Sequence, residues 1–356
     1  MIKRTQFILL ILFLLSGFQE TIAQTTSYLK NPLITDAITL FNREQYDSAL
    51  TICQSIIDAD STNPMGYFGA AVIYYGTIRN YWTRYFEAEF DGLITIGIEK
   101  SEQMIEKCPN NAESYFMYGA GLGFRGMYKI KKGEWFSAFK DGLSGYRNLK
   151  KAYTLDDKLY DAYYGLGVFY YMKSVKAKVL TFLRLMKDER EKGIEFIKLS
   201  IEKGRFVPLE AQLELIKIYY EEGQYETALA ECRIIEPEFH LNTGYQYVLA
   251  NILDKRQLWE EAYSRYEIVI DNIFRSPYPK SNALLGTCYY GLANAEYHME
   301  QNHNALINCY KAIDYFGNFD PDKEFTSSMV DIGDIQNATK DLLKKLQKAT
   351  EINTEN

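Results

Sequence analysis

Few side chains in this chain of 356 residues are spaced for catalysis or metal binding. The three histidines are His240, His298 and His303, and no two of them would share a helical face as metal ligands or stand beside a nucleophile. The chain has no glycine-rich phosphate loop and no Gly-x-Ser-x-Gly sequence, and its carboxylates are scattered over expected helix exteriors. We therefore predict no enzyme activity, no cofactor and no metal site.

The five cysteines follow expected helices rather than a disulfide framework. Cys53, Cys232 and Cys309 each lie four residues after a small residue of an expected helix, where cysteine packs as a small apolar side chain. Cys108 and Cys288 remain, and an odd total without regular spacing argues against a set of disulfides. The sequence leaves open whether any pair is oxidised.

A sequence pattern of nine residues occurs six times and marks the helices that would position a binding surface. We call this pattern the nine-residue word and its positions letters 1 to 9. In each copy, letters 1, 4, 5 and 8 fall on one helical stripe, and letter 5 is Ala or Gly in five copies. A small residue there lets a second helix approach closely. The copies begin at Tyr67, Tyr115, Tyr163, Gln212, Gln246 and Tyr289.

A second set of small residues follows the same register and marks the partner helices. Its intervals are 48, 48, 48, 35, 34 and 43 residues, so two independent markers predict seven helical hairpins. The units between residues 67 and 205 carry fourteen extra residues each, which we expect to lengthen both helices and add roughly 10 Å of height. The second set is Ala49, Gly97, Gly145, Gly193, Ala228, Ala262 and Ala305.

The stretch 289–312 resembles the tetratricopeptide repeat, because an aromatic residue, Leu-Ala and Tyr are followed by an Ala in the second helix. The 34-residue interval also equals that family's period. The resemblance implies an all-α, right-handed solenoid of about seven antiparallel hairpins that binds partners. Ile335, Ala338, Leu342 and Leu346 keep helical spacing, which predicts a C-terminal capping helix.

The predicted organisation has five parts. Residues 1–23 are a signal peptide, 24–62 the first hairpin, and 63–206 three extended hairpins. Residues 207–317 form three ordinary hairpins, and 318–356 form a loop, the capping helix and a frayed tail.

Letters 2, 6 and 9 of the nine-residue word would, by the resemblance, line the concave groove where partners lie. Aromatic rings and asparagines suit an extended or helical protein segment. The alternative is that the rings pack against the tall hairpins themselves. The predicted groove residues are Phe68, Val72, Tyr75, Phe116, Tyr164, Val168, Tyr171, Lys217, Tyr220, Tyr247, Asn251, Tyr290, Asn294 and Tyr297.

The Lys and Asn pairs of the family's carboxylate clamp are incomplete. Lys217, Asn251 and Asn294 are present, but a second lysine is missing. Binding of a C-terminal carboxylate is therefore not predicted.

Charge is uneven along the chain. The net charge is −7, which argues against a general nucleic-acid binder, yet residues 121–205 hold nine more basic than acidic residues. The segment 173–192 flanks an apolar run with cations, so it could contact a membrane surface or an acidic partner, or could cover neighbouring helices. Its cations of interest are Lys173, Lys176, Lys178, Arg184 and Lys187.

The N-terminus has the layout of a secretory signal peptide. Lys3 and Arg4 precede the apolar run 7–18, and cleavage is expected after Ala23. The alternative is a retained membrane anchor, although the run is short for one. No cysteine stands at the cleavage point, so we expect a soluble periplasmic or extracellular product.

These observations predict an exported, non-enzymatic scaffold or adaptor that binds a protein or peptide partner and no nucleic acid. One alternative is a peripheral membrane protein that uses segment 173–192. Another is an α-helical enzyme acting on envelope glycans or peptides.

Overall fold

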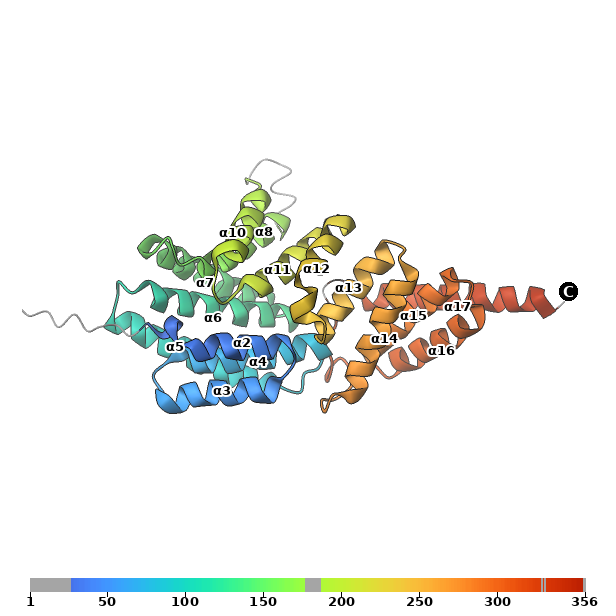
Figure 1. Ribbon diagram of the computed structural model, residues 1–356, viewed down its shortest axis with the longest axis horizontal. Coiled ribbons are helices and arrows are strands. Elements are labelled where there is room, and N and C mark those ends of the chain that lie inside the picture. Colours follow the sequence, from blue (N-terminus) through green and yellow to red (C-terminus); the bar gives the residue numbers. More distant parts are fainter. Residues whose placement is uncertain (1–26, 177–186, 328, 330, 355–356) are drawn as a thin grey trace, which may run out of the picture.

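The computed structural model describes residues 27–176, 187–327, 329 and 331–354, and within them the chain is built from helices (Figure 1). After a short 3-10 turn, η1 (Tyr28–Lys30), seven antiparallel hairpins follow one another along the molecule. The long helix α17 (Ile332–Thr354) ends the solenoid and projects from one end (Figure 1). The predicted all-α solenoid of seven hairpins with a C-terminal helix is confirmed.

Each hairpin pairs a first helix with a second helix. The pairs are α2 (Pro32–Asn42) with α3 (Tyr46–Ala59), α4 (Pro64–Tyr81) with α5 (Glu87–Lys107), α6 (Ala112–Lys131) with α7 (Trp135–Leu155), α8 (Asp161–Lys176) with α10 (Arg190–Lys203), α11 (Pro208–Glu221) with α12 (Tyr225–Phe239), α13 (Thr243–Lys255) with α14 (Trp259–Arg275), and α15 (Asn282–His298) with α16 (Asn302–Gly317).

Most first helices begin where the sequence offers a capping side chain. Asn63 accepts a hydrogen bond from the amide of Met65, and Asn111 accepts one from Ser114. Asn242 and Ser281 cap α13 and α15 in the same way. These caps satisfy amides that have no partner inside the helix, so the turns before the first helices are fixed locally.

The helices of the second and third hairpins are the long ones. They contain 18 to 21 residues, against 13 to 17 in α11 to α16. The additional residues therefore lengthen the helices themselves. In the fourth hairpin the connection at 177–186 lies outside the described residues.

The two helices of a hairpin cross at the small residues that marked the register. A Cβ atom built on Gly167 of α8 would lie 2.6 Å from the carbonyl oxygen of Gly193 on α10. Ala293 and Ala305 are completely buried at the corresponding crossing of the last hairpin. Backbones that come this close leave no room for a larger side chain, which is why both helices carry small residues at the same height.

Gly167→Ala should lower the free energy of unfolding by about 1 to 3 kcal/mol, because the added methyl group must displace the backbone of Gly193. Gly142→Ala is the matched control, since a Cβ on that glycine of α7 meets nothing within 4 Å. That change should leave the stability equal or raised by up to about 1 kcal/mol. Urea unfolding followed by circular dichroism would measure both, and equal stability of the two variants would contradict the close crossing.

Candidate functional site

The inner layer of the solenoid consists of the first helices of the hairpins. Successive first helices contact one another, as α4 does with α6, α6 with α8, and α13 with α15, whereas each of the second helices α5 and α7 packs between two first helices. We call the side formed by the first helices the inner surface. The repeat pattern predicts that this side is concave and binds partners, so it is the first candidate for binding.

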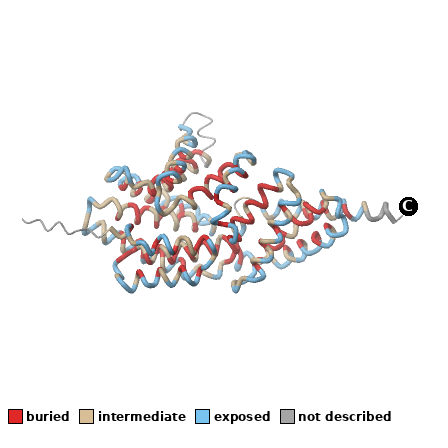
Figure 2. The backbone as a smooth tube through the Cα atoms, in the orientation of Figure 1, coloured by how far each residue is buried: buried red, intermediate tan, exposed pale blue. Residues whose placement is uncertain are grey.

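Most of the predicted groove residues are buried inside this layer. Phe68, Tyr75, Phe116, Tyr164, Tyr171, Tyr220, Tyr247 and Asn251 are buried, and Val72, Val168, Lys217, Tyr290, Asn294 and Tyr297 are half-buried. Figure 2 shows the burial as long stretches along α11 and α13. The buried rings pack within the protein, as the alternative interpretation expects, and their use by a partner stays a prediction.

The chain closes on itself between the second and sixth hairpins. Trp82, directly after α4, packs edge-on against Tyr247 of α13, with ring centroids 5.2 Å apart. The backbone amide of Phe325 donates to the carbonyl oxygen of Trp82 at 2.8 Å, and the amide of Arg84 donates to that of Lys323 at 2.9 Å. The inner surface is therefore not one continuous groove, because α13 and the segment 323–325 lie against the end of α4.

The carboxylate of the half-buried Glu44 connects both sides of this closure. Glu44, in the turn between α2 and α3, accepts hydrogen bonds from the amide and hydroxyl of Thr243, each at 2.8 Å. It also accepts from the hydroxyl of Tyr81 at 2.6 Å and from the side-chain amide of Asn80 at 3.1 Å. Burial raises the pKa of Glu44 above its ordinary value, and the hydrogen bonds offset only part of that effect.

Charged side chains gather where the inner surface still meets solvent. Arg79 of α4 pairs with Glu210 of α11, and Lys217 pairs with Glu214 at 2.6 Å. Arg79 and Glu210 keep 22% and 20% of their side-chain surface exposed. Lys131, at the end of α6, lies within electrostatic range of Arg79 and Lys217. We call these five residues the inner charged cluster; it holds three cations and two carboxylates.

Two groups of this region are incompletely paired. Lys131 forms no ion pair with a described residue, and burial together with the neighbouring cations lowers its pKa to about 8. The buried hydroxyl of Tyr164, which is coupled electrostatically to Arg79 and Glu210, has no hydrogen-bond partner among the described residues. Lys131 keeps part of its surface exposed, whereas the Tyr164 hydroxyl is enclosed by protein, so Lys131 is the one of the two that is open to a ligand group.

The sequence prediction included Lys217 of the cluster and the nearby Tyr164. It missed the other four residues of the cluster, which are Arg79, Lys131, Glu210 and Glu214. Arg79 lies four residues after Tyr75, the last letter of its nine-residue word, and Lys131 lies eight residues after the last letter of its own word. Residues four apart share a helical face. Continuing the pattern of letters 2, 6 and 9 by one or two further helical turns would therefore have included Arg79 and Lys131. Glu210 lies before the nine-residue word that begins at Gln212, so the repeat pattern does not indicate it.

The C-terminal part of the predicted groove is used by the chain itself. Asn294 donates to the carboxylate of Asp254 at 2.8 Å. Tyr290 and Tyr297 pack with a small cluster that includes Leu342 and Leu346 of α17. The capping helix thus covers part of this end of the inner surface.

The predicted basic segment is only partly described. The amine of Lys173 is 2.7 Å from a carboxylate oxygen of Glu189, and Lys187 is exposed. Lys178 and Arg184 lie outside the described residues, as does the side chain of Lys176. Contact of this segment with a membrane or an acidic partner stays a prediction.

The cysteines predicted to pack as apolar residues do so. Cys53, Cys232 and Cys309 are buried, and burial raises the pKa of each thiol to about 12. Cys288 is also buried, and all five thiols are free. Thiols with such pKa values are poor nucleophiles at neutral pH.

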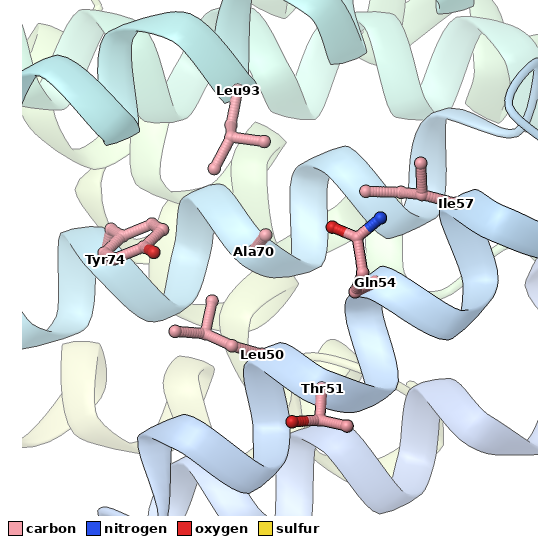
Figure 3. Close-up of a pocket in the computed structure, with 7 residues that line it drawn as sticks. All are labelled: Leu50, Thr51, Gln54, Ile57, Ala70, Tyr74 and Leu93. Carbon is pink, nitrogen blue, oxygen red and sulfur yellow. The ribbon is translucent and has the colours of Figure 1, made fainter.

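A shallow hollow of about 300 Å³ lies away from the inner charged cluster, between α3, α4 and α5 (Figure 3). In the close-up, Leu50, Tyr74 and Leu93 surround the small side chain of Ala70, and Gln54 stands at one side. Ile57 and Thr51 complete the lining. No charged group lines the hollow, so it offers shape without a polar group that would orient a ligand.

Two further features are absent from residues 27–176, 187–327, 329 and 331–354. No three His, Cys, Asp or Glu side chains gather there as a metal ion would require. None of the helices in those ranges is long and apolar enough to cross a bilayer.

Comparison with known proteins shows the fold. No protein-family model and no curated protein matches the chain. The APC/C hetero-tetramer Cut9-Hcn1 is similar in structure, with a TM-score of 0.52 and 12% identity over 91% of this chain. The match spans only 57% of that chain.

Two smaller solved structures are also similar. YrrB, described as a TPR protein with an unusual peptide-binding site, has a TM-score of 0.45 and 17% identity over 62% of this chain and 94% of its own. The C-terminal part of a TPR repeat-containing protein from Cytophaga hutchinsonii has a TM-score of 0.41 and 14% identity over 79% of this chain and 95% of its own.

The half-buried Glu44 predicts a specific pH dependence. Because its pKa is raised in the folded state, the ionised carboxylate costs stability, and this cost disappears as pH falls toward the ordinary carboxyl value of 4.5. As the pH is lowered from 8 to about 4.5, the free energy of unfolding of the parent should therefore rise relative to that of Glu44→Gln. Urea unfolding across this range measures the difference, with the exposed Glu99→Gln as the matched control. A constant difference between the parent and Glu44→Gln would contradict the buried carboxylate.

Proposed function

We propose that this chain, which has the fold of the tetratricopeptide-repeat proteins, is a non-enzymatic scaffold or adaptor for a protein or peptide partner. The fold supports the general class, because stacked hairpins present long surfaces for binding. The proposal rests chiefly on the inner charged cluster, where Lys131 forms no ion pair with a described residue and has the Phe325 ring 5.8 Å from its amine. The half-buried Val72 and Val168 add apolar surface to the inner layer.

The partner should bring an acidic group to this cluster. Three cations face two carboxylates, so one positive charge is left uncompensated at a site largely surrounded by protein. A carboxylate on the partner would neutralise Lys131, which keeps part of its surface exposed. The proposed binding site is therefore smaller than the tyrosine-rich groove predicted from the repeat pattern, because it includes only the solvent-accessible part of that groove.

Lys131→Met should weaken capture of the natural partner by about tenfold or more, because a hydrogen bond to a charged group contributes about 1.5 to 3 kcal/mol. Lys132→Met, at the exposed neighbouring position, is the matched control and should bind as the parent does. Tyr164→Phe is a second control, because it removes only a hydroxyl enclosed by protein and should preserve both the fold and the binding. The measurement is affinity capture from the cell envelope fraction with quantitative mass spectrometry, repeated by titration of the isolated partner.

Equal capture by the parent and Lys131→Met, with the fold intact, would contradict a role of this cluster. Capture that is lost instead in Tyr164→Ala with Tyr171→Ala, at unchanged stability, would restore the aromatic groove as the binding surface.

Export is part of the proposal and rests on residues 1–23, which lie outside the described ranges. Intact-mass measurement of the exported protein should give a chain that begins at Gln24. A mass that includes residues 1–23 would support the retained anchor instead. Membrane contact through 173–192 stays a prediction, since most of its apolar run lies outside the described residues.

A further inference from the structure

The start of α7 exposes a group of large apolar side chains. Trp135 is 59% exposed, Phe136 86% and Phe139 67%, and Ile130 at the end of α6 is 39% exposed. We call these four residues the aromatic tip. Leaving such side chains in water forgoes the free energy that their burial would give, so a group of neighbouring exposed apolar side chains usually marks an interaction surface.

The outer face of α7 continues from the aromatic tip as a row of cations. Lys140, Arg147, Lys150 and Lys151 are exposed, and none of them forms an ion pair with a described residue. Positions 136, 140, 147 and 151 repeat at helical spacing, so the aromatic and basic residues share one side of the helix. Phe136 and Lys150 are fourteen helical steps apart, so this side is about 21 Å long.

The one carboxylate of α7 is removed from that face. Asp141 is buried and accepts hydrogen bonds from Arg125 at 2.7 and 2.9 Å and from Lys129 at 2.7 Å. Between residues 112 and 155 the chain has eight Lys or Arg and three Asp or Glu, although its overall net charge is −7. The outer face of α7 therefore carries aromatic and cationic side chains, and the exposed Glu134 just before the helix lies 3.4 Å from the amine of Lys132.

We propose that the outer face of α7 binds the surface of an anionic lipid bilayer. The aromatic tip enters the boundary between headgroups and acyl chains, where Trp and Phe are favoured, and the row of cations contacts lipid phosphates. Charge complementarity selects this occupant, since no acidic group on the face would repel phosphate. A protein partner is a poorer fit, because lysine is depleted in the cores of protein interfaces.

Vesicles of phosphatidylcholine with and without phosphatidylglycerol test the proposal by co-sedimentation of the full chain. The parent should bind the anionic vesicles more tightly. Lys150→Glu with Lys151→Glu should weaken this binding by roughly 25-fold or more, since each basic residue near an anionic surface contributes about fivefold. Phe136→Ser with Phe139→Ser should weaken binding by about tenfold or more, because apolar contact with the bilayer is lost.

Matched controls change equally exposed residues elsewhere. Ile234→Ser with Leu241→Ser removes apolar side chains that are 68% and 51% exposed, and Lys340→Glu with Lys345→Glu reverses exposed charges on α17. Both controls should bind as the parent does. All variants carry the same N-terminal segment, so any binding by the apolar run 7–18 is common to all of them.

A local readout separates the aromatic tip from other contacts. In Trp259→Phe, the remaining tryptophans are the exposed Trp135 and the buried Trp82. Emission should shift to the blue and be quenched by brominated lipid as Trp135 enters the bilayer. Absence of vesicle binding by the parent, or binding that survives both variant pairs of α7, would overturn the proposal. So would loss of self-association or of protein capture in Phe136→Ser with Phe139→Ser while vesicle binding is unchanged.

Discussion

The carboxylate of Glu44 is buried between two hairpins that are distant in sequence, and the shape of the inner surface depends on how it is satisfied. Its four hydrogen bonds come from Asn80 and Tyr81 at the end of α4 and from Thr243 at the start of α13. A buried charge without such donors would cost several kcal/mol, so these groups must stay together. That requirement keeps α4 against α13 and places Trp82 on Tyr247.

The closure covers one inner ring, that of Tyr247, and packing between neighbouring helices buries others. In an open solenoid, the rings of letters 2 and 9 would point into a solvent-filled groove. Here Tyr75 packs near Phe90 and Tyr128, with centroids 5.6 and 6.5 Å away, and Tyr247 is covered by Trp82. The charged groups at the ends of α4 and α6 and along α11 keep part of their surface exposed.

The register of the hairpins could be read from the sequence because each crossing imposes a local rule. Gly167 and Gly193, or Ala293 and Ala305, must both be small for two backbones to meet, and that rule repeats with every unit. The contacts that hold the end of α4 against α13 follow no repeating sequence pattern. Glu44 stands in a tight turn with a left-handed backbone (φ 56°), and Thr243 is simply the first residue of a helix. Nothing in their spacing marks them as partners, so the sequence placed the rings on the inner side without showing that they would be covered.

The third hairpin contributes to both proposed binding surfaces, the inner charged cluster and the outer face of α7. Its first helix, α6, ends at Lys131 in the inner charged cluster, whereas its second helix, α7, turns the aromatic tip and the row of cations outward. The ion pairs of Asp141 with Arg125 and Lys129 lie between the two helices and neutralise the charge that would otherwise oppose an anionic surface. Because the inner and outer faces belong to different helices, a partner on one side would leave the other side free. A single rigid hairpin could then hold a partner at a fixed distance from a membrane.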